Sequence, residues 1–385
     1  MPLALTPLRT VAMTFGAFGI GVGLWSGGSA ALIARAGVSP ATFGVTLTVF
    51  TAVYLFGMSA ASTFARIVGL NRVVIGALLL GVPLLALVLT ANGPVALIGG
   101  LVSFGLAGGL LDAGMNAQAV ALEKELRRPI MARLHGVASG GVAASAVLGS
   151  LIVTGPSPWI AAVLGAFGYG AAAMALAVAG PADPARAPIG SATLQPRVMT
   201  RSLVVIGLVV GVSIVSETAT LAWSAPLLRA EAPALAAIAG LGGAFFAGCQ
   251  ALLRFNADAL RHRISDRTLI AVSLGVAAGG LVIAALPLGF AASVLGFAIV
   301  GFGTAAIVPC GFALAASRPG VPNAAAISAV AFFGLFSRVP APVLTGVIAE
   351  AFSLSVAFVA IAALLALAMI AFLLFVPATP REAQT

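Results

Sequence analysis

Residues 11–33 read VAMTFGAFGIGVGLWSGGSAALI, a run of about 23 residues without a charged side chain. A bilayer core about 30 Å thick is crossed by about 20 helical residues, because each residue adds about 1.5 Å. The run is too long for the apolar core of a cleaved signal peptide, so we expect it to stay in the protein as a first membrane helix. This stretch therefore predicts a membrane protein.

The composition extends this prediction to the whole chain. Of 385 residues, 61% are hydrophobic and 8% are charged, whereas soluble domains carry about 25% charged residues. The net charge of +9 would suggest nucleic-acid binding in a soluble protein, but here the basic residues lie in short gaps between apolar runs. We expect no nucleic-acid partner. Cys249 and Cys310 lack CxxC spacing, so neither a metal site nor a cofactor is predicted.

Eleven further apolar runs follow the first, and continuous runs favour helices over a β-barrel. The predicted spans are 11–33, 41–65, 73–91, 95–121, 130–153, 158–179, 202–228, 234–254, 268–287, 289–315, 323–349 and 353–376. The predicted fold is an all-α membrane protein with twelve transmembrane helices in two pseudo-symmetric six-helix halves. Residues 1–179 form the first half, the proline-rich segment 180–200 is a cytoplasmic linker, and 201–385 form the second half.

Basic residues predict the orientation, because cytoplasmic loops of membrane proteins are rich in Lys and Arg. With the N-terminus in the cytoplasm, only Arg35 and Arg229 of the 19 Lys and Arg residues fall in loops on the other side. Arg338 falls within a span, and Arg254 counts as a cytoplasmic charge at the end of the eighth span. Both termini are therefore predicted to be cytoplasmic, in a bacterial inner membrane.

The two halves carry traces of an internal repeat. Trp25-Ser26 in the first span recurs as Trp223-Ser224 in the seventh, at an offset of 198. Two further landmarks recur at offsets near 196 and 194: Gly69–Arg72 with Ser265–Arg267, and Glu123-Lys124 with Ser317-Arg318. A slowly drifting offset indicates duplication of a six-helix unit, as in many secondary transporters.

The loops after the second span of each half carry a family resemblance. Residues 65–72 read ARIVGLNR and residues 256–267 read NADALRHRISDR. Both resemble degenerate copies of the G-x-x-x-D-R-x-G-R-R loop of the major facilitator superfamily. The first copy lacks the aspartate and the second lacks the glycine. The candidate gating residues in these loops are Gly69, Arg72, Asp258, Arg263 and Arg267.

A longer stretch is more specific. Residues 108–120, GGLLDAGMNAQAV, resemble the MosC-like bacterial branch of this superfamily, together with Glu123, Arg128-Pro129, His135-Gly136, Ser139–Gly141 and Glu217–Trp223. The resemblance implies a monomer that moves a small molecule by a rocker-switch mechanism. It also implies that spans 1, 4, 7 and 10 line a central cavity.

Three charged residues fall at membrane depth. Placing a charged side chain there costs about 2.5–3.5 kcal/mol, so we expect each of them to have a structural or functional role. They are Asp112, Glu217 and Arg338. Glu217 lies 16 residues after Arg201 and Arg338 lies 16 residues after Pro322, so the two reach similar depths and an ion pair is allowed. Such a pair could be a structural bridge between spans 7 and 11. Alternatively, Glu217 exchanges a proton or contacts the substrate.

The remaining candidates also have two interpretations each. Asp112 and Asn116 stand four residues apart on one helix face, where they present a polar patch to substrate or serve helix packing. Trp25 and Trp223 either anchor their helices at the membrane interface or stack on a sugar, cyclitol or aromatic substrate.

The leading hypothesis is a proton-coupled secondary transporter of a small polar organic solute that is sugar-, cyclitol- or amine-like. A drug or metabolite efflux pump and a non-transporting substrate sensor are the alternatives. An enzyme is not expected. His135 and Ser139 share a helix face, but no oriented acid or oxyanion-hole motif accompanies them.

Overall fold

A computed structural model of the chain describes residues 5–183, 200–261, 263–318 and 321–378. Most of the linker predicted for residues 180–200 lies outside these ranges. The described chain is helical, with the elements α1 (Pro7–Gly27), α2 (Ser29–Ala36), α3 (Pro40–Val68), α4 (Leu70–Leu89), α5 (Pro94–Leu126), α6 (Met131–Thr154), α7 (Trp159–Ala179), α8 (Arg201–Glu231), η2 (Pro233–Ile238), α9 (Leu241–Phe255), α10 (Ala257–Arg261), α11 (Asp266–Ala285), α12 (Phe290–Thr304), α13 (Ile307–Ala316), α14 (Asn323–Arg338), α15 (Ala341–Ala351) and α16 (Leu354–Phe375).

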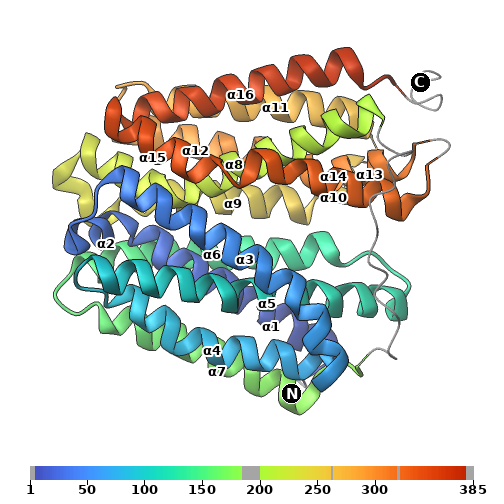
Figure 1. Ribbon diagram of the computed structural model, residues 1–385, viewed down its shortest axis with the longest axis horizontal. Helices are drawn as coiled ribbons and strands as arrows, with labels where there is room; N and C mark the ends of the chain where they lie inside the picture. Colours follow the sequence, from blue (N-terminus) through green and yellow to red (C-terminus); the bar gives the residue numbers. More distant parts are fainter. Residues whose placement is uncertain (1–4, 184–199, 262, 319–320, 379–385) are drawn as a thin grey trace.

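These helices form two lobes side by side: α1 to α7 make the lower lobe in Figure 1 and α8 to α16 the upper lobe. Eleven of the predicted spans are long and apolar enough to cross a membrane, and the eighth is the shorter apolar helix α9, preceded by η2. The predicted fold class, an all-α membrane protein in two six-helix halves, is confirmed.

Four of the predicted spans are not continuous helices. Each consists of two helical segments, so the prediction of one unbroken helix is wrong for these four. The first span breaks at Gly28 into α1 and α2, and the eighth begins as the 3-10 helix η2. The tenth divides into α12 and α13. The eleventh divides into α14 and α15 at Pro340, because proline lacks the N–H that a helix interior needs and its ring clashes with the preceding turn.

The lobes meet mainly along two helix pairs, α3 with α15 and α6 with α9, and α8 also packs on α1 and α2. Glycines allow this approach, as small residues commonly do between membrane helices. A Cβ on Gly44 would lie 2.9 Å from the Cα of Gly346 in the other lobe. A Cβ on Gly240 would collide with the carbonyl oxygen of Ala146 on α6. The two lobes are therefore in close contact where α3 meets α15 and where Gly240, before α9, meets α6.

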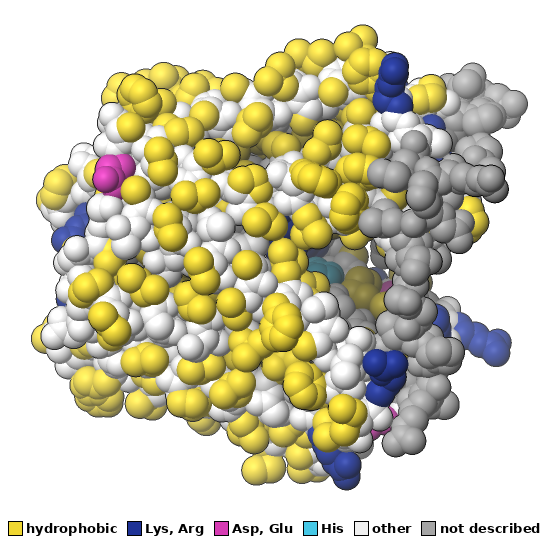
Figure 2. All heavy atoms as spheres, in the orientation of Figure 1, with side chains coloured by type: hydrophobic (Ala, Val, Ile, Leu, Met, Phe, Trp, Pro, Cys, Tyr) yellow, Lys and Arg dark blue, Asp and Glu magenta, His cyan; other side chains and the backbone are white. Residues whose placement is uncertain are grey.

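We call the side where α1 begins and α16 ends the terminal face, and the opposite side the distal face. Figure 2 shows hydrophobic side chains spread between the two faces, with Lys and Arg toward the margins. On the distal face Arg35 donates to the carbonyls of Leu89, Ala91 and Val153, the C-terminal ends of α4 and α6. The two faces are thus distinct, whereas their orientation in the cell stays a prediction.

Candidate functional site

A cavity of about 200 Å³ lies between the lobes and is lined by both of them. Figure 2 shows the molecule hollowed between the lobes at the terminal face. Most of the cavity wall is apolar, with Arg338 and three threonines as its main polar members. Seven aromatic side chains contribute to the wall: Phe18, Trp25, Phe50, Tyr54, Phe104, Tyr169 and Trp223.

The helices that line the cavity differ in part from the expected set. Spans 1, 4 and 7 contribute through α1, α5 and α8, as expected, but span 10 adds none of the described lining residues. Its first half, α12, packs too closely on its own lobe: a Cβ on Gly301 would collide with the backbone of Phe246. Spans 2, 6 and 11 also line the cavity, through α3, α7, α14 and α15.

The tryptophans shared by the repeat both lie in the cavity wall. Trp25 is 6% exposed and Trp223 is 2% exposed, and their rings lie 6.3 Å and 5.1 Å from those of Phe50 and Phe43. A tryptophan that anchors a helix among lipid headgroups keeps its ring accessible, as Trp159 does at 59% exposure. The geometry therefore favours the cavity interpretation over membrane anchoring.

Arg338 is the last residue of α14 and lines the cavity at the break before α15. It makes no ion pair or hydrogen bond with any residue that the structure describes, and its Nε is buried without an acceptor. The predicted ion pair between Glu217 and Arg338 is therefore not formed. Equal depth along two helices was a weak criterion, because it does not specify which way the side chains point.

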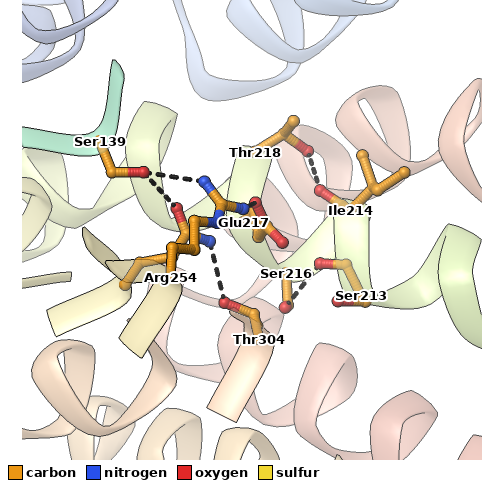
Figure 3. A network of polar contacts seen from close by, with 9 residues as sticks. Ser139, Ser213, Ile214, Ser216, Glu217, Thr218, Arg254 and Thr304 are labelled. Carbon is orange, nitrogen blue, oxygen red and sulfur yellow. Dashed lines mark hydrogen bonds and ion pairs between the residues drawn. The ribbon is translucent and has the colours of Figure 1, made fainter. Parts of the chain in front are cut away.

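Glu217 pairs instead with Arg254, whose Nη2 lies 3.5 Å from Glu217 Oε2 (Figure 3). Each side chain is 17% exposed. Arg254, counted in the sequence as a cytoplasmic charge at the end of the eighth span, lies in the last turn of α9, and its guanidinium turns into the protein to reach Glu217. Arg254 also donates from Nη1 to Ser139 Oγ on α6, at 2.8 Å.

This contact extends into a network that joins four helices, α6, α8, α9 and α12 (Figure 3). Ser139 Oγ donates to Gln250 Oε1 at 3.2 Å, and Gln250 Nε2 donates to Thr304 Oγ1 at 3.3 Å. Ser139 belongs to the first lobe and the other members belong to the second. The network therefore links the lobes through side chains, and Glu217 Oε1 is left buried without a partner.

Asp112 and Asn116 form a second network inside the first lobe. Tyr54 donates from its hydroxyl to Asp112 Oδ2 at 2.7 Å, and Asn116 donates from Nδ2 to Asp112 Oδ1 at 2.8 Å. Asn116 Oδ1 lies 3.1 Å from His135 Nε2 on α6. A Cβ on Gly109 would collide with the Tyr54 carbonyl oxygen, so this glycine lets α3 and α5 approach closely enough for the contact. Asp112 thus lies behind the ring of Tyr54, not in the cavity wall.

The first gating loop is held within its own lobe. Gly69 has φ +95°, a conformation that strains residues with a Cβ. Asn71 N–H donates to Asp183 Oδ1 at 2.9 Å, so an acid from beyond α7 stands at the start of α4, near the loop that lacks its own aspartate. Arg72 donates to the carbonyl of Val68 at 3.3 Å.

The second gating loop is also anchored in its own lobe. Arg267 donates from Nε to the carbonyl of Val376, at the end of α16, at 2.8 Å. Arg261 forms two hydrogen bonds with Asp266, at 2.8 and 3.0 Å, and Arg263 is exposed. The side chain of Asp258 lies outside the described part of the chain. A gating role for these loops stays a prediction.

In the described part of the chain, no three His, Cys, Asp or Glu side chains gather in a way that could hold a metal ion. The chemistry available is therefore that of a mostly apolar cavity between the lobes, with an arginine in its wall and two carboxylate networks beside it. Such an arrangement can bind a solute and hold protons.

Three relatives match most of the chain. The uncharacterized transporter y4wD of Sinorhizobium fredii is 28% identical over 92% of this chain and 94% of its own length. An uncharacterized MFS-type transporter of Yersinia pestis is 29% identical, over 90% of each chain. The membrane protein MosC of Rhizobium meliloti is 29% identical over 82% of this chain and 76% of its own. No family model matches the chain.

Solved structures agree on the fold. The nucleoside transporter NupG has a TM-score of 0.77 at 12% identity, over 96% of this chain and 100% of its own. A bacterial homologue of the lysosomal transporter Spinster, inward-facing and occupied, has a TM-score of 0.75 at 13% identity, over 97% of each chain. The chain is thus similar over most of its length to MFS-type transporters, and it has the fold of solved transporters. As the sequence predicted, it resembles MosC.

Sequence reasoning missed Tyr54 and Gln250 as members of these networks, and it noted Ser139 only beside His135. All three side chains are neutral, so the cost of placing a charge in a membrane does not draw attention to them. The spacing of Gln250 and Arg254, four residues apart, was an available signal. It places both on the helix face that Phe246 buries.

Proposed function

We propose that this chain is a secondary transporter that moves a small organic solute across the bacterial inner membrane by alternating access. The observation that supports this is the cavity between the lobes. Both lobes line it, the molecule is hollowed at the terminal face, and hydrogen bonds between the lobes close the distal face. A solute in such a cavity reaches one side of the membrane at a time, provided that the two lobes rock about it.

We call the hydrogen bonds that join the lobes toward the distal face the distal gate. Each would have to break for the cavity to open on that face. A hydrogen bond contributes about 0.5–1.5 kcal/mol net, so four contribute about 2–6 kcal/mol, which substrate binding can offset. The four bonds run from Arg229 Nη1 to Ala30 O (3.0 Å), from Ala41 N to Glu350 Oε2 (2.8 Å), from Val343 N to Thr48 Oγ1 (3.0 Å) and from Gly240 N to Ser150 Oγ (2.9 Å).

The positions of the basic residues support placing the terminal face in the cytoplasm. Both termini would then be cytoplasmic and the cavity would be open inward. We also propose that residues 1–179 and 201–385 are the two moving halves and that residues 180–200 link them in the cytoplasm. Because one chain holds both lobes and the cavity, a monomer is sufficient.

We propose that protons drive the transport and that Glu217 is the coupling residue. Protonation of Glu217 would remove the charge that holds Arg254, and Arg254 also bonds Ser139 in the other lobe. A proton on Glu217 would therefore loosen a contact between the lobes. Asp112 is a second candidate, since its network ties α3 and α5 to His135 on α6.

Flux in proteoliposomes tests the proposal. The background variant Cys249→Ala with Cys310→Ala would carry Thr48→Cys and Val343→Cys, at two positions that a hydrogen bond of the distal gate joins. We expect exchange of a bound solute to stop on oxidation and to return on reduction, whereas Thr48→Cys alone stays active. Sugars, cyclitols, amines and organic acids are the solute classes to screen.

Continued exchange with the crosslink formed would contradict alternating access. Solute binding without any exchange would identify a sensor. Glu217→Gln should abolish uptake driven by a proton gradient while leaving exchange between equal solute concentrations, and unchanged gradient-driven uptake would remove Glu217 from the coupling mechanism. The same assay reads the direction of transport, which separates uptake from efflux.

A further inference from the structure

The charges around the cavity are not equally satisfied. Glu217 is paired with Arg254, and both oxygens of Asp112 accept hydrogen bonds from Tyr54 and Asn116. Arg338 has no such partner among the described residues: neither carboxylate lies within ion-pair distance, and its Nε is buried without an acceptor. Guanidinium is always charged and carries five donors, so the cavity wall presents a cation that no described carboxylate contacts directly, although the charges of Asp112 and Glu217 act on it from a longer distance.

The backbone next to Arg338 adds to the positive potential. Pro340 breaks the span, and α15 begins at Ala341. Thr48 Oγ1 accepts the N–H of Val343 and Pro342 has no N–H, which leaves the N–H of Ala341 at this end of the helix. The first N–H groups of a helix lack intrahelical acceptors and carry the positive end of its dipole. Ala341 and Pro342 line the cavity together with Arg338. A half-helix N-terminus at a break inside a membrane transporter is a known arrangement for holding an anionic substrate group.

The rest of the wall would suit a flat apolar body. The rings of Trp25, Phe50 and Trp223 line the cavity, and the polar groups near them are threonine hydroxyls. Pockets for drug-sized ligands measure about 300–1,000 Å³, so a cavity of about 200 Å³ takes something smaller, such as one ring with a short side chain.

We propose that the transported solute is a small organic anion with a flat apolar body, its carboxylate bound between Arg338 and the start of α15 and its body against Trp25, Phe50 and Trp223. This rests on the proposed function and narrows its substrate. A cation at the same place would be repelled by Arg338. At about 5 Å and an effective dielectric constant of about 20, that repulsion weakens binding on the order of a hundredfold.

Matched ligands test the charge requirement. Phenylacetate, its neutral isostere phenylacetamide and the cation phenethylamine share one ring, and benzoate and cinnamate with their amides extend the series. Binding to the purified protein in detergent would be measured by thermal stabilisation and by fluorescence of the cavity tryptophans. We expect at least one acid to bind ten- to a hundredfold more tightly than its amide, and the amine not to bind.

Variants assign the effect to Arg338. Arg338→Gln should weaken binding of the acid ten- to a hundredfold and leave binding of the amide unchanged, and Arg338→Lys should lie between because it keeps the charge without the fork. Arg66→Gln, an exposed arginine at the terminal end of α3, is the matched control and should bind as the parent does. The amide measurement also shows that Arg338→Gln is folded.

The outcomes separate this inference from the proposed function. If no acid binds more tightly than its amide, or if Arg338→Gln binds the acid as well as the parent, the anion site is wrong. Exchange of a neutral solute in proteoliposomes by Arg338→Gln would then leave the transport proposal standing. Binding of an acid that depends on Arg338, with no exchange in proteoliposomes, would support the anion site and contradict transport.

Discussion

Replacing Glu217 with glutamine should destabilise the protein more than replacing its partner Arg254 with glutamine. Removing one member of a buried ion pair costs about 3–5 kcal/mol, and the lower end applies here because each side chain is 17% exposed. The carboxyl of Glu217 can take up a proton when Arg254 is absent. The guanidinium of Arg254 cannot lose one when Glu217 is absent. The two single variants should therefore be unequal.

The expected size follows from the length of the chain. An unfolding entropy of about 2.1 cal/mol/K per residue gives about 0.8 kcal/mol/K for 385 residues, so about 3 kcal/mol lowers Tm by about 4 °C. The double variant Glu217→Gln with Arg254→Gln should recover part of this loss, with an interaction energy of about 2 kcal/mol. Thermal unfolding of the detergent-solubilised protein measures all four species.

A parallel cycle between Glu217 and Arg338 is the control. These two side chains form no ion pair but interact through their charges, so their interaction energy should be clearly smaller than that of the Arg254 cycle. If Glu217→Gln keeps the parental Tm, or if the Arg254 cycle is additive while the Arg338 cycle is not, the pairing described here is refuted.

Three further changes test other contacts. Tyr54→Phe removes a donor from Asp112 and should cost about 1.5–3 kcal/mol of stability; an unchanged Tm would mean that this bond does not hold Asp112. Trp223→Ala should lower the free energy of unfolding by about 3–5 kcal/mol because the ring is 2% exposed. The control Trp159→Ala should change it by no more than about 0.5 kcal/mol. Equal losses of stability in thermal unfolding would contradict the burial of Trp223. Arg35→Ala removes three hydrogen bonds to helix ends and should lower Tm by about 2–4 °C, while solute binding persists. An unchanged Tm would show that these bonds contribute little to stability.

Much of the fold could be predicted because membrane insertion is a local property of the chain. Each span needs about 20 apolar residues, and the lipid makes that requirement visible in the sequence. The breaks within spans were harder to predict. Gly28 lies inside a span that is apolar throughout, and only the packing against Val153 shows why the backbone turns there. Pro340 was a local signal that the span count did not use.

The site was predicted less well, because its contacts join residues that are distant in sequence. The cost of placing a charge in the membrane identified Glu217 and Arg338 as candidates. It could not show which residue pairs with Glu217. Arg254 resembled a topology signal since it ends a span, and its inward direction depends on how α9 packs against α6 and α8. Sequence position alone contains no such information.

The three charges predicted at membrane depth are satisfied in three different ways. Asp112 is held by neutral donors of its own lobe, and Glu217 is held by an arginine of its own lobe. Arg338 is held by nothing in the described chain. A partly buried charge without a direct partner lowers stability, and binding of a group of opposite charge recovers the loss. Of the three, Arg338 is therefore the one whose presence is best explained by a ligand.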